Sequence, residues 1–298
     1  MHQSTPGLPE FDYVRPSSLL EASQFLAEHA GEARPFLGGT DTFVRMRDGV
    51  WKDKYLVDIK NLNGMKEVSF DPLGGLIIGA AVNMNQVIAE PDVNQYYPLL
   101  VQSSATVASH QLRSRATIVG NICNASPAGD TIGACIVLQG VLQVYGVNGF
   151  REEPLSGFFL GPGRTSLNPG DLALSIRFPL APVGHAARYI KLGRNASSDL
   201  AIVGVTALAY PDQTAASGYR FRLALASVAP TPIVPVAAEQ ILANNLLTPE
   251  TILLAAKAAQ DSATPISDPR GSARYRKEMV KNLTKQAVTD VWSQLRRE

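Results

Sequence analysis

Apolar residues recur every three or four positions near the start of the chain, between residues 19 and 26. This spacing predicts an amphipathic helix, because residues three and four apart lie on the same helix face. Ser18 precedes the stripe and Glu21 follows three residues later, which is the pattern of a capping box. Gly31 is the expected C-terminal cap of this helix.

The first half of the chain predicts short strands and helices that alternate. Turn residues at 71–74 and at Asn148-Gly149 indicate two β-hairpins. A short helix is expected to begin at Asn83 or Asn85. Residues 115–130 are rich in small side chains and too irregular for one element. Strands are predicted over residues 34–37, 55–59, 65–70, 76–80, 141–147 and 151–155, and helices from 40 or 41 to 49, over 98–109 and over 131–138.

The composition changes at the Pro-Leu-Ala-Pro sequence over 179–182, which indicates a boundary between one domain over residues 1–180 and a second over 181–298. The second domain predicts antiparallel strands over residues 186–192, 201–210 and 219–228, and helices over 236–243, 249–259 and 272–295.

The last predicted helix, over 272–295, has an apolar stripe. This stripe covers the chain's own core, or docks in part against a partner chain; both interpretations stay open.

The charge balance argues against nucleic acid or an anionic membrane as a partner, because 27 basic and 26 acidic residues give a formal net charge of +1. Hydrophobic residues make up 45% of the 298, which is enough for a large core. No stretch approaches the ~20 apolar residues of a membrane-spanning helix, and the first residues lack the apolar segment of a secretory signal. We therefore expect a cytoplasmic protein without membrane contact.

Common catalytic motifs are missing from the sequence. It contains no G-x-x-x-x-G-K-S/T, no strand-linked G-x-G-x-x-G, no H-E-x-x-H and no G-x-S-x-G. The histidines are scattered, and none has zinc-ligand spacing with Cys123 or Cys135. These two cysteines are too few for an iron–sulfur cluster, which usually takes about four. We expect no catalytic side chain and no metal ligand in this chain.

A glycine-rich segment over residues 36–42, Phe-Leu-Gly-Gly-Thr-Asp-Thr, joins a predicted strand to a predicted helix. Adjacent glycines let a ligand approach the main chain, and consecutive backbone N–H groups can cradle a phosphate. The positive end of the following helix points to the same place. A tight turn that holds no ligand explains the segment equally well.

A second segment, residues 117–130, combines small polar groups with glycines. Backbone donors there suit a pyrophosphate, and a carboxylate suits a hydroxyl-bearing chain, so the segment fits a dinucleotide. An ordinary polar surface loop is the alternative, and the apolar residues inside the segment argue against it. The polar groups are the hydroxyls of Thr117 and Ser126, the amides of Asn121 and Asn124 and the carboxylate of Asp130, with Gly120 and Gly129 between them.

Six segments over nearly the whole chain resemble the FAD-binding subunits and domains of the xanthine dehydrogenase and carbon monoxide dehydrogenase family. No single segment is decisive; the resemblance rests on the presence of all six in the family's order and spacing. They are Gly-Gly-Thr-Asp at 38–41, Thr-Ile-Val-Gly-Asn at 117–121, Asn-Ala-Ser-Pro-Ala-Gly-Asp at 124–130, the stretch 158–171 that begins Phe-Phe-Leu-Gly, Tyr-Ile-Lys at 189–191, and Arg-Gly-Ser-Ala-Arg-Tyr-Arg at 270–276.

The resemblance implies an α+β fold, the FAD-binding fold of the vanillyl-alcohol oxidase (PCMH) type. Two small α/β lobes would hold the FAD, and a C-terminal antiparallel sheet-and-helix domain of the carbon monoxide dehydrogenase type would cover it. The resemblance also implies a set of cofactor-binding residues. They are Leu37, Gly38, Gly39, Thr40, Asp41 and Thr42 in the first segment, Thr117, Gly120, Asn121, Cys123, Asn124 and Asp130 in the second, and Leu167 and Lys191 further along.

Two separate phosphate-type segments predict FAD instead of FMN, because only FAD has a pyrophosphate. We expect noncovalent binding, since neither segment contains a histidine or tyrosine for a covalent link. Lys191 on its predicted strand could place positive charge near a reduced flavin; the alternative is a solvated strand lysine. Cys123 is expected to be structural, although its backbone could lie near the ligand.

The resemblance further implies an oxidoreductase subunit that transfers electrons. In this family a large molybdopterin subunit hydroxylates the substrate, and a small subunit with two 2Fe–2S clusters passes the electrons to the FAD. The FAD delivers them to NAD⁺, oxygen or another acceptor. The expected assembly is a dimer of such heterotrimers. Two other readings stay open: a stand-alone FAD-dependent oxidoreductase of the same fold, and a non-enzymatic dinucleotide-binding module.

Two residues depart from the family pattern. Val119 stands where a glycine is usual, and a β-branched residue resists positive φ, so we expect a β-like or shifted backbone there. Ser166 stands where relatives often place an apolar residue beside the flavin ring, which leaves the packing of that ring open.

Overall fold

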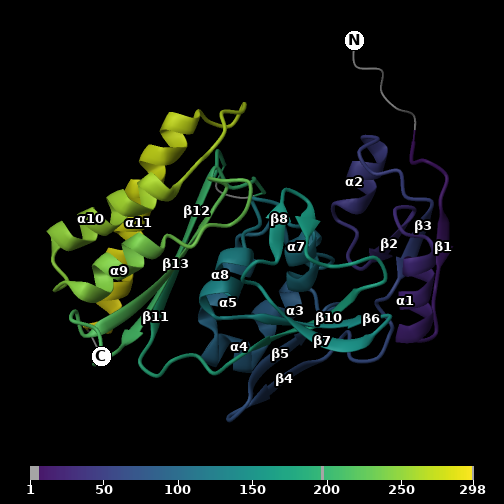
Figure 1. Ribbon diagram of the computed structural model, residues 1–298, viewed down its shortest axis with the longest axis horizontal. Helices are drawn as coiled ribbons and strands as arrows, with labels where there is room; N and C mark the ends of the chain where they lie inside the picture. Colours follow the sequence, from purple (N-terminus) through teal and green to yellow (C-terminus); the bar gives the residue numbers. More distant parts are fainter. Residues whose placement is uncertain (1–6, 196–197, 297–298) are drawn as a thin grey trace.

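The computed structural model describes residues 7–195 and 198–296. Three lobes follow one another along the longest axis of the molecule, in the order of the sequence (Figure 1). We call residues 7–58 the N-terminal lobe, residues 59–178 the central lobe and residues 186–296 the C-terminal lobe. Each has its own sheet, and the central and C-terminal lobes each have a large cluster of buried apolar side chains.

The N-terminal lobe is built on a three-stranded parallel sheet. Its strands β1 (Asp12–Val14), β3 (Tyr55–Asp58) and β2 (Ala33–Phe36) lie in that order. Parallel strands need a crossover connection, and α1 (Leu19–Glu28) and α2 (Thr42–Arg47) provide it. The strands predicted over 34–37 and 55–59 are confirmed, whereas β1 was not foreseen from the sequence.

The capping prediction for α1 is only half correct. The side chain of Ser18 accepts a hydrogen bond from the Glu21 N–H at 3.1 Å, as expected. The Glu21 carboxylate instead accepts bonds from the backbone N–H and hydroxyl of Ser17, one residue earlier, so the reciprocal bond of a capping box is missing. The helix also ends sooner than expected, with His29 as its C-cap, and Gly31 lies beyond the cap at a φ of +82°.

The central lobe is built on a five-stranded antiparallel sheet. Both predicted hairpins are confirmed: β4 (Val68–Asp71) pairs with β5 (Gly75–Gly79), and β6 (Val141–Gly146) pairs with β7 (Gly149–Pro154). The strand β10 (Leu172–Phe178) lies between β5 and β6 and joins the two hairpins into one sheet. The sequence did not predict this central strand.

Short helices cover this sheet and lead toward the neighbouring lobes. Asn83 caps the first of them with a complete capping box, in which Gln86 is the partner. The helix predicted over 98–109 is shorter than expected, because Ala108 takes a φ of +41° and Ser109 caps a new helix. The helices are α3 (Met84–Ala89), α4 (Pro91–Tyr96), α5 (Pro98–Ala105), α6 (His110–Arg113), α7 (Ile118–Cys123) and α8 (Ile132–Val137), and a small ribbon of β8 (Phe159–Gly161) and β9 (Arg164–Thr165) follows β7.

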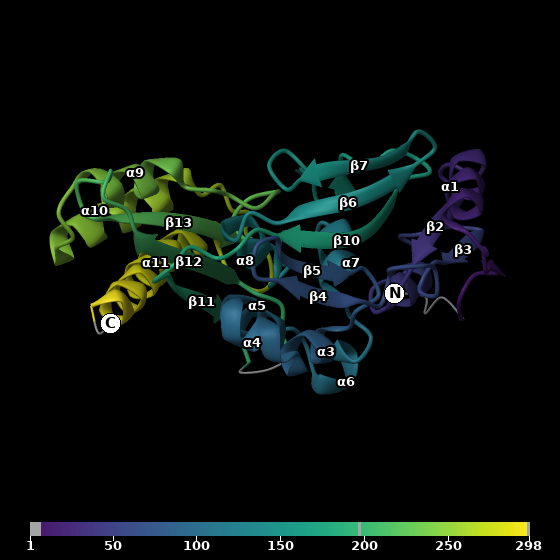
Figure 2. The ribbon, with the colours of Figure 1, turned by 90° about the horizontal axis from the view of Figure 1, so that it is seen from below.

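The C-terminal lobe has an antiparallel sheet in the order β11 (Ala186–Leu192), β12 (Val203–Pro211) and β13 (Tyr219–Ala226), as predicted. The helices α9 (Val236–Asn244), α10 (Pro249–Ser262) and α11 (Ala273–Leu295) pack together, and α9 and α11 contact the strands (Figure 2). The helices α5 and α8 of the central lobe also contact this sheet. Residues 203–209 of β12 are consequently all buried, which explains their unbroken run of small and apolar side chains.

The apolar stripe of α11 mainly covers the core of its own lobe. Of the predicted stripe, Ala287, Val291 and Leu295 are buried in the cluster that also contains the inner face of the sheet, Met279 and Leu283 pack partly against it, and Tyr275 is 43% exposed. Among the described residues, no helix combines the length and the apolar character needed to cross a membrane.

Candidate functional site

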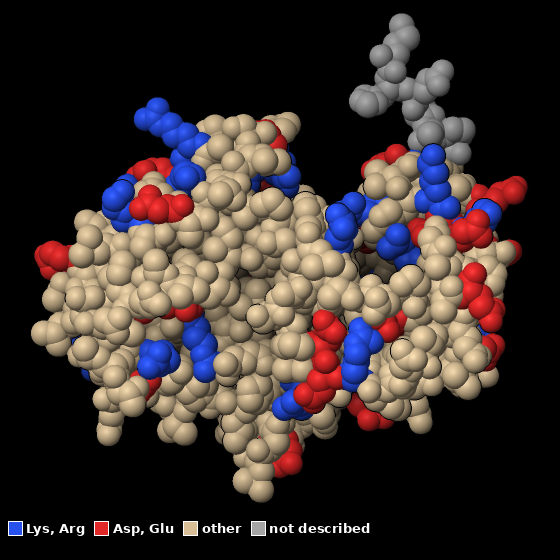
Figure 3. Space-filling model, viewed as in Figure 1, with Lys and Arg blue, Asp and Glu red and all other residues tan. Residues whose placement is uncertain are grey.

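A cleft of about 660 Å³ lies where the N-terminal and central lobes meet. Both segments singled out in the sequence line it, together with Gly163, Thr165 and residues 167–171 beyond β8 and with Ser198, Asp199 and Leu200 from the loop after β11. Every predicted cofactor-binding residue except Lys191 is part of its wall. Figure 3 shows a hollow beside the N-terminal lobe with Lys and Arg side chains around it.

The first segment forms the turn between β2 and α2. Gly39 has a φ of +71°, and a Cβ placed there would lie 2.5 Å from the Phe36 ring. The glycine is therefore required by the fold itself, whereas the sequence suggested only that a ligand must approach closely. Within the described chain, no carbonyl or side chain accepts a hydrogen bond from the N–H groups of Gly39, Thr40 or Asp41. These adjacent donors are available to an anion.

We predict that Gly39→Ala lowers the free energy of unfolding by about 3 kcal/mol, because it adds backbone strain to a steric clash with Phe36. Gly64→Ala is the matched control. Gly64 has a φ of +78° but no atom within 4 Å of its Cβ position. Gly64→Ala therefore adds backbone strain alone and should lower the free energy of unfolding by only about 1 kcal/mol. Urea unfolding measures both values, and equal losses would contradict the role given to Phe36.

The second segment is more regular than the sequence indicated. Residues 118–123 form the six-residue helix α7, and the Thr117 side chain caps it by accepting a bond from the Gly120 N–H at 2.9 Å. The expectation for Val119 was wrong: it lies inside this helix and is buried. A β-branched residue tolerates helical angles, and the cap and the apolar contacts outweigh its low helix propensity. A Cβ on Gly120 would lie 2.7 Å from Thr117 Oγ1, so the cap also requires glycine here.

The two segments touch each other. Asn124 Nδ2 donates to Asp41 Oδ2 at 2.6 Å, and Arg115 Nε donates to the Gly38 carbonyl at 3.2 Å. The backbone of Gly38 packs so closely on the Arg115 carbonyl that no Cβ would fit between them. The side-chain oxygen of Asn124 is buried without a hydrogen-bond partner. Such an orphan acceptor is costly unless a ligand or water satisfies it, so it marks a point where a donor group is expected.

Asp130, Tyr189 and Lys191 form a buried polar cluster behind the cleft. Asp130 accepts hydrogen bonds from the Tyr189 hydroxyl at 2.6 Å and from Lys191 Nζ at 2.7 Å, and Lys191 also donates to the Thr106 carbonyl at 3.0 Å. Burial raises the pKa of the Asp130 carboxyl, although Lys191 and Tyr189 act to lower it. Burial and the nearby carboxylate raise the pKa of Tyr189 well above its usual value.

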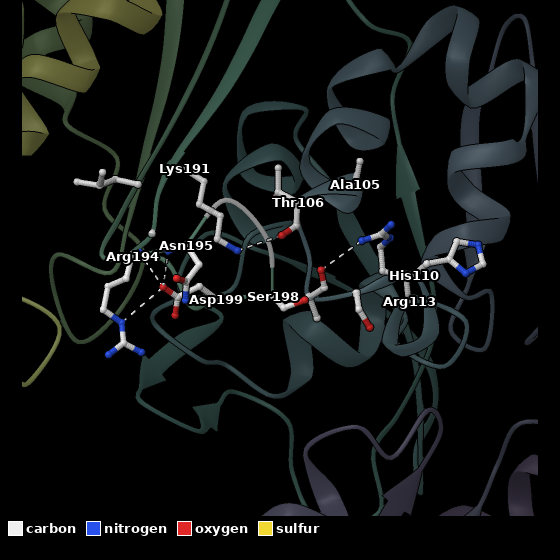
Figure 4. Close-up of a pocket in the computed structure, with 13 residues that line it drawn as sticks. Ala105, Thr106, His110, Arg113, Lys191, Arg194, Asn195, Ser198 and Asp199 are labelled. Carbon is white, nitrogen blue, oxygen red and sulfur yellow. Dashed lines mark hydrogen bonds and ion pairs between the residues drawn. The ribbon is translucent and has the colours of Figure 1, made fainter.

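Lys191 is thus neither a solvated strand lysine nor part of the cleft wall. It lines an adjoining cavity of about 740 Å³, which lies between α6 and the loop that follows β11. Figure 4 shows Lys191 and Arg194 on one side of this cavity and His110 and Arg113 on the other. Asp130 lies in the cleft wall and its carboxylate separates Lys191 from the cleft, whereas Ala108, Ser198 and Asp199 line both spaces.

Comparisons with known proteins decide the family of the chain. A family described as "FAD binding domain in molybdopterin dehydrogenase" matches residues 9–181, and one described as "CO dehydrogenase flavoprotein C-terminal domain" matches residues 188–291. The chain belongs to the FAD-binding medium subunits of the xanthine dehydrogenase and carbon monoxide dehydrogenase family. As an FAD-binding subunit it is an oxidoreductase component of the molybdenum hydroxylases, as the sequence motifs implied.

Individual relatives agree over almost their whole length. The carbon monoxide dehydrogenase medium chain of Hydrogenophaga pseudoflava is 30% identical, with 96% of this chain and 98% of that one aligned. The glyceraldehyde dehydrogenase medium chain of Sulfolobus acidocaldarius is 32% identical, with 95% and 99% aligned. A solved structure of the Hydrogenophaga pseudoflava carbon monoxide dehydrogenase, which lacks the Mo-pyranopterin moiety, superimposes with a TM-score of 0.91 over 96% of this chain and 99% of that chain. The expected α+β FAD-binding fold is confirmed.

Three further residues singled out in the sequence, Leu167, Cys123 and Ser166, differ in their relation to the cleft of this FAD-binding subunit. Leu167 adds an apolar contact to the cleft wall. Cys123 also lines it, and burial raises the pKa of its thiol to about 12, so the group is a neutral contact and not a nucleophile. Ser166 does not line the cleft, because its hydroxyl donates to Glu153 Oε1 at 2.6 Å. The side chain at this departure therefore contributes nothing to the cleft lining.

Sequence reasoning missed a cationic end of the cleft in the FAD-binding subunit. Arg34, Arg45 and Trp51 line it, and the guanidinium carbon of Arg34 lies 3.7 Å from the centre of the Trp51 ring. These residues belong to no motif and converge only when β2, α2 and the following loop fold together. Among the described residues, no group of three or more His, Cys, Asp or Glu side chains could hold a metal ion.

Proposed function

We propose that this subunit holds one FAD noncovalently in the cleft between its N-terminal and central lobes and uses it to pass electrons from a partner's iron–sulfur clusters to an external acceptor. The observation that carries the proposal is the contact between the two segments through Asp41 and Asn124, supported by the bond from Arg115, just before the second segment, to the Gly38 carbonyl. It brings two sets of anion-binding groups to one cleft, which suits a ligand with adjacent phosphates.

The chain's own residues would divide the work of binding. The free N–H groups over 39–41 are suited to the pyrophosphate, and the unpaired Asn124 side-chain oxygen to a donor group nearby. Arg45 offers positive charge and Trp51 an aromatic face at one end of the cleft, whereas the charge of Arg34 is already paired with Asp53 at 2.9 Å. Bound FAD supplies the ability to accept electrons singly and to release them in pairs. Leu167 would exclude water from its part of the cleft wall, and the buried cluster of Asp130, Tyr189 and Lys191 would hold a fixed arrangement of charges behind the wall.

The partners follow from the same reading. The relatives are medium subunits of multi-subunit molybdenum hydroxylases, and this chain has only Cys123 and Cys135, too few for a cluster of its own. We infer a large molybdopterin-binding subunit and a small subunit with two 2Fe–2S clusters, assembled as a dimer of heterotrimers. We also propose 1–180 and 181–298 as the two domains, a division supported by the two family matches over residues 9–181 and 188–291.

Release of the cofactor tests the proposal. The purified chain should show the visible absorbance of a flavin in a near-equimolar amount. Heat or acid denaturation should release the colour into the supernatant, where it should run as FAD on chromatography, because no covalent bond holds it. A colourless chain that fails to take up added FAD, recovery of FMN, or colour that stays in the protein pellet would each contradict the proposal.

A further inference from the structure

Arg276 in the first turn of α11 is a charged residue that the fold buries almost completely, with 4% of its surface exposed. It closes the Arg-Gly-Ser-Ala-Arg-Tyr-Arg segment over 270–276, to which binding of FAD gives no direct role. The guanidinium donates to the Ile202 carbonyl at 2.6 Å, to the Ser227 carbonyl at 3.0 Å and to Asp268 Oδ1 at 2.7 Å. Burial of a charge is costly even when it is paired, so its particular partners need a reason.

Ser227 connects Arg276 to the wall of the cleft. Its N–H donates to the Pro127 carbonyl at 2.7 Å, and Pro127 lies in the middle of the Asn-Ala-Ser-Pro-Ala-Gly-Asp segment. Ser227 takes a φ of +64°, and its hydroxyl is buried without a partner. Both features cost free energy, so they indicate that the backbone is held in this position by the contacts on either side.

Ile202 connects Arg276 to a second part of the wall. The Ile202 N–H donates to the Leu192 carbonyl at 2.7 Å and so closes the loop after β11. Asp199 and Leu200 of that loop line the cleft. One guanidinium nitrogen, Nη1, therefore holds the base of this loop and the support of residues 124–130 at the same time.

We propose that Arg276 is a positioning residue for the FAD site, which fixes residues 124–130 through Ser227 and the loop after β11 through Ile202. The inference rests on the proposed function, because it assigns the cleft to FAD. Loss of this anchor leaves both segments attached but free to shift. Because contacts of this kind couple distant sites by amounts that correspond to a few-fold to about thirtyfold in affinity, we expect about tenfold weaker binding of FAD.

The test compares Arg276→Met with Arg274→Met, an exposed arginine two residues earlier on the same helix. Two quantities are measured well below the unfolding temperature: the dissociation constant for FAD in a titration of the FAD-free chain, and amide hydrogen exchange over residues 124–130 without FAD. Arg276→Met should weaken FAD binding about tenfold and speed exchange in this segment, and Arg274→Met should change neither. Arg276→Lys keeps a charged donor but not the planar fork, so it should lie between the wild type and Arg276→Met.

A folded Arg276→Met that binds FAD within about twofold of the wild type and keeps its exchange pattern would overturn the inference. So would faster exchange spread evenly over the C-terminal lobe with unchanged FAD affinity, because that describes a purely structural residue. If Arg276→Met does not fold, Arg276→Lys decides the matter by the same two measurements. Failure of the wild type to bind FAD would refute the proposed function instead, and the exchange data on the FAD-free chain would still test the anchoring of residues 124–130.

Discussion

Asp130→Ala should destabilise the chain by about 3–5 kcal/mol, because it leaves a buried ammonium group without its counter-charge. Lys191 would retain only the Thr106 carbonyl, and the Tyr189 hydroxyl would lose its acceptor. The side chains of Asp130 and Lys191 are only 8% and 12% exposed, so water cannot easily replace the lost partner. The free energy of unfolding in urea measures the loss, with and without added FAD.

A matched control and a second variant separate the possible causes. Asp261→Ala removes the acid of an exposed ion pair with Lys257 on α10, and it should cost at most about 0.5 kcal/mol. Asp130→Ala combined with Lys191→Met removes both buried charges and should recover part of the loss. A loss below about 1 kcal/mol for Asp130→Ala, or a double variant less stable than the single one, would show that the stranded charge is not the cause.

The sequence predicted the parts of the cleft that are contiguous in the chain. The glycines and hydroxyls over 37–42 and 117–130 are recognisable because a turn that approaches a phosphate restricts the residue type at each position. Two features escaped for the same physical reason. Arg34 and Trp51 meet only after the N-terminal lobe has folded, and β10 joins two hairpins that are distant in sequence. Contacts of this kind leave no local pattern in the chain.

Other errors arose where tertiary contacts override local preference. Residues 118–123 contain a glycine and a valine, both poor helix formers, yet the Thr117 cap and full burial of Ile118 and Ile122 stabilise a helix there. For Lys191 the sequence left two predictions open, a solvated strand lysine or a positive charge near the flavin. The buried Asp130 carboxylate, 61 residues away in sequence, determines its true place. A charge partner so distant cannot be inferred from the strand alone.

The largest expected effect is the dependence of substrate turnover on partner chains. The purified subunit should bind FAD and yet hydroxylate no substrate, and turnover should appear only when a molybdopterin chain and a two-cluster iron–sulfur chain are present. The described residues contain no cluster of metal ligands, and the two cysteines of the chain cannot hold iron and sulfur in the usual way. Cys123 and Cys135 are also chemically quiet, since burial raises the pKa of both thiols.

Co-expression with the genes for such chains, followed by purification through a tag on this subunit, measures the effect. A large and a small chain should be recovered together with the visible absorbance of iron–sulfur clusters, and the mass of the assembly should fit a dimer of heterotrimers. Omission of either partner should reduce turnover to background, and the FAD-depleted complex should lose electron delivery to the acceptor. Robust turnover by the single chain would instead identify a stand-alone flavoenzyme, in which a base beside the cleft acts on the substrate directly. Asp130 is poorly placed for that role, because each of its carboxylate oxygens already accepts a hydrogen bond, from Tyr189 and from Lys191, and a substrate would have to compete with these contacts.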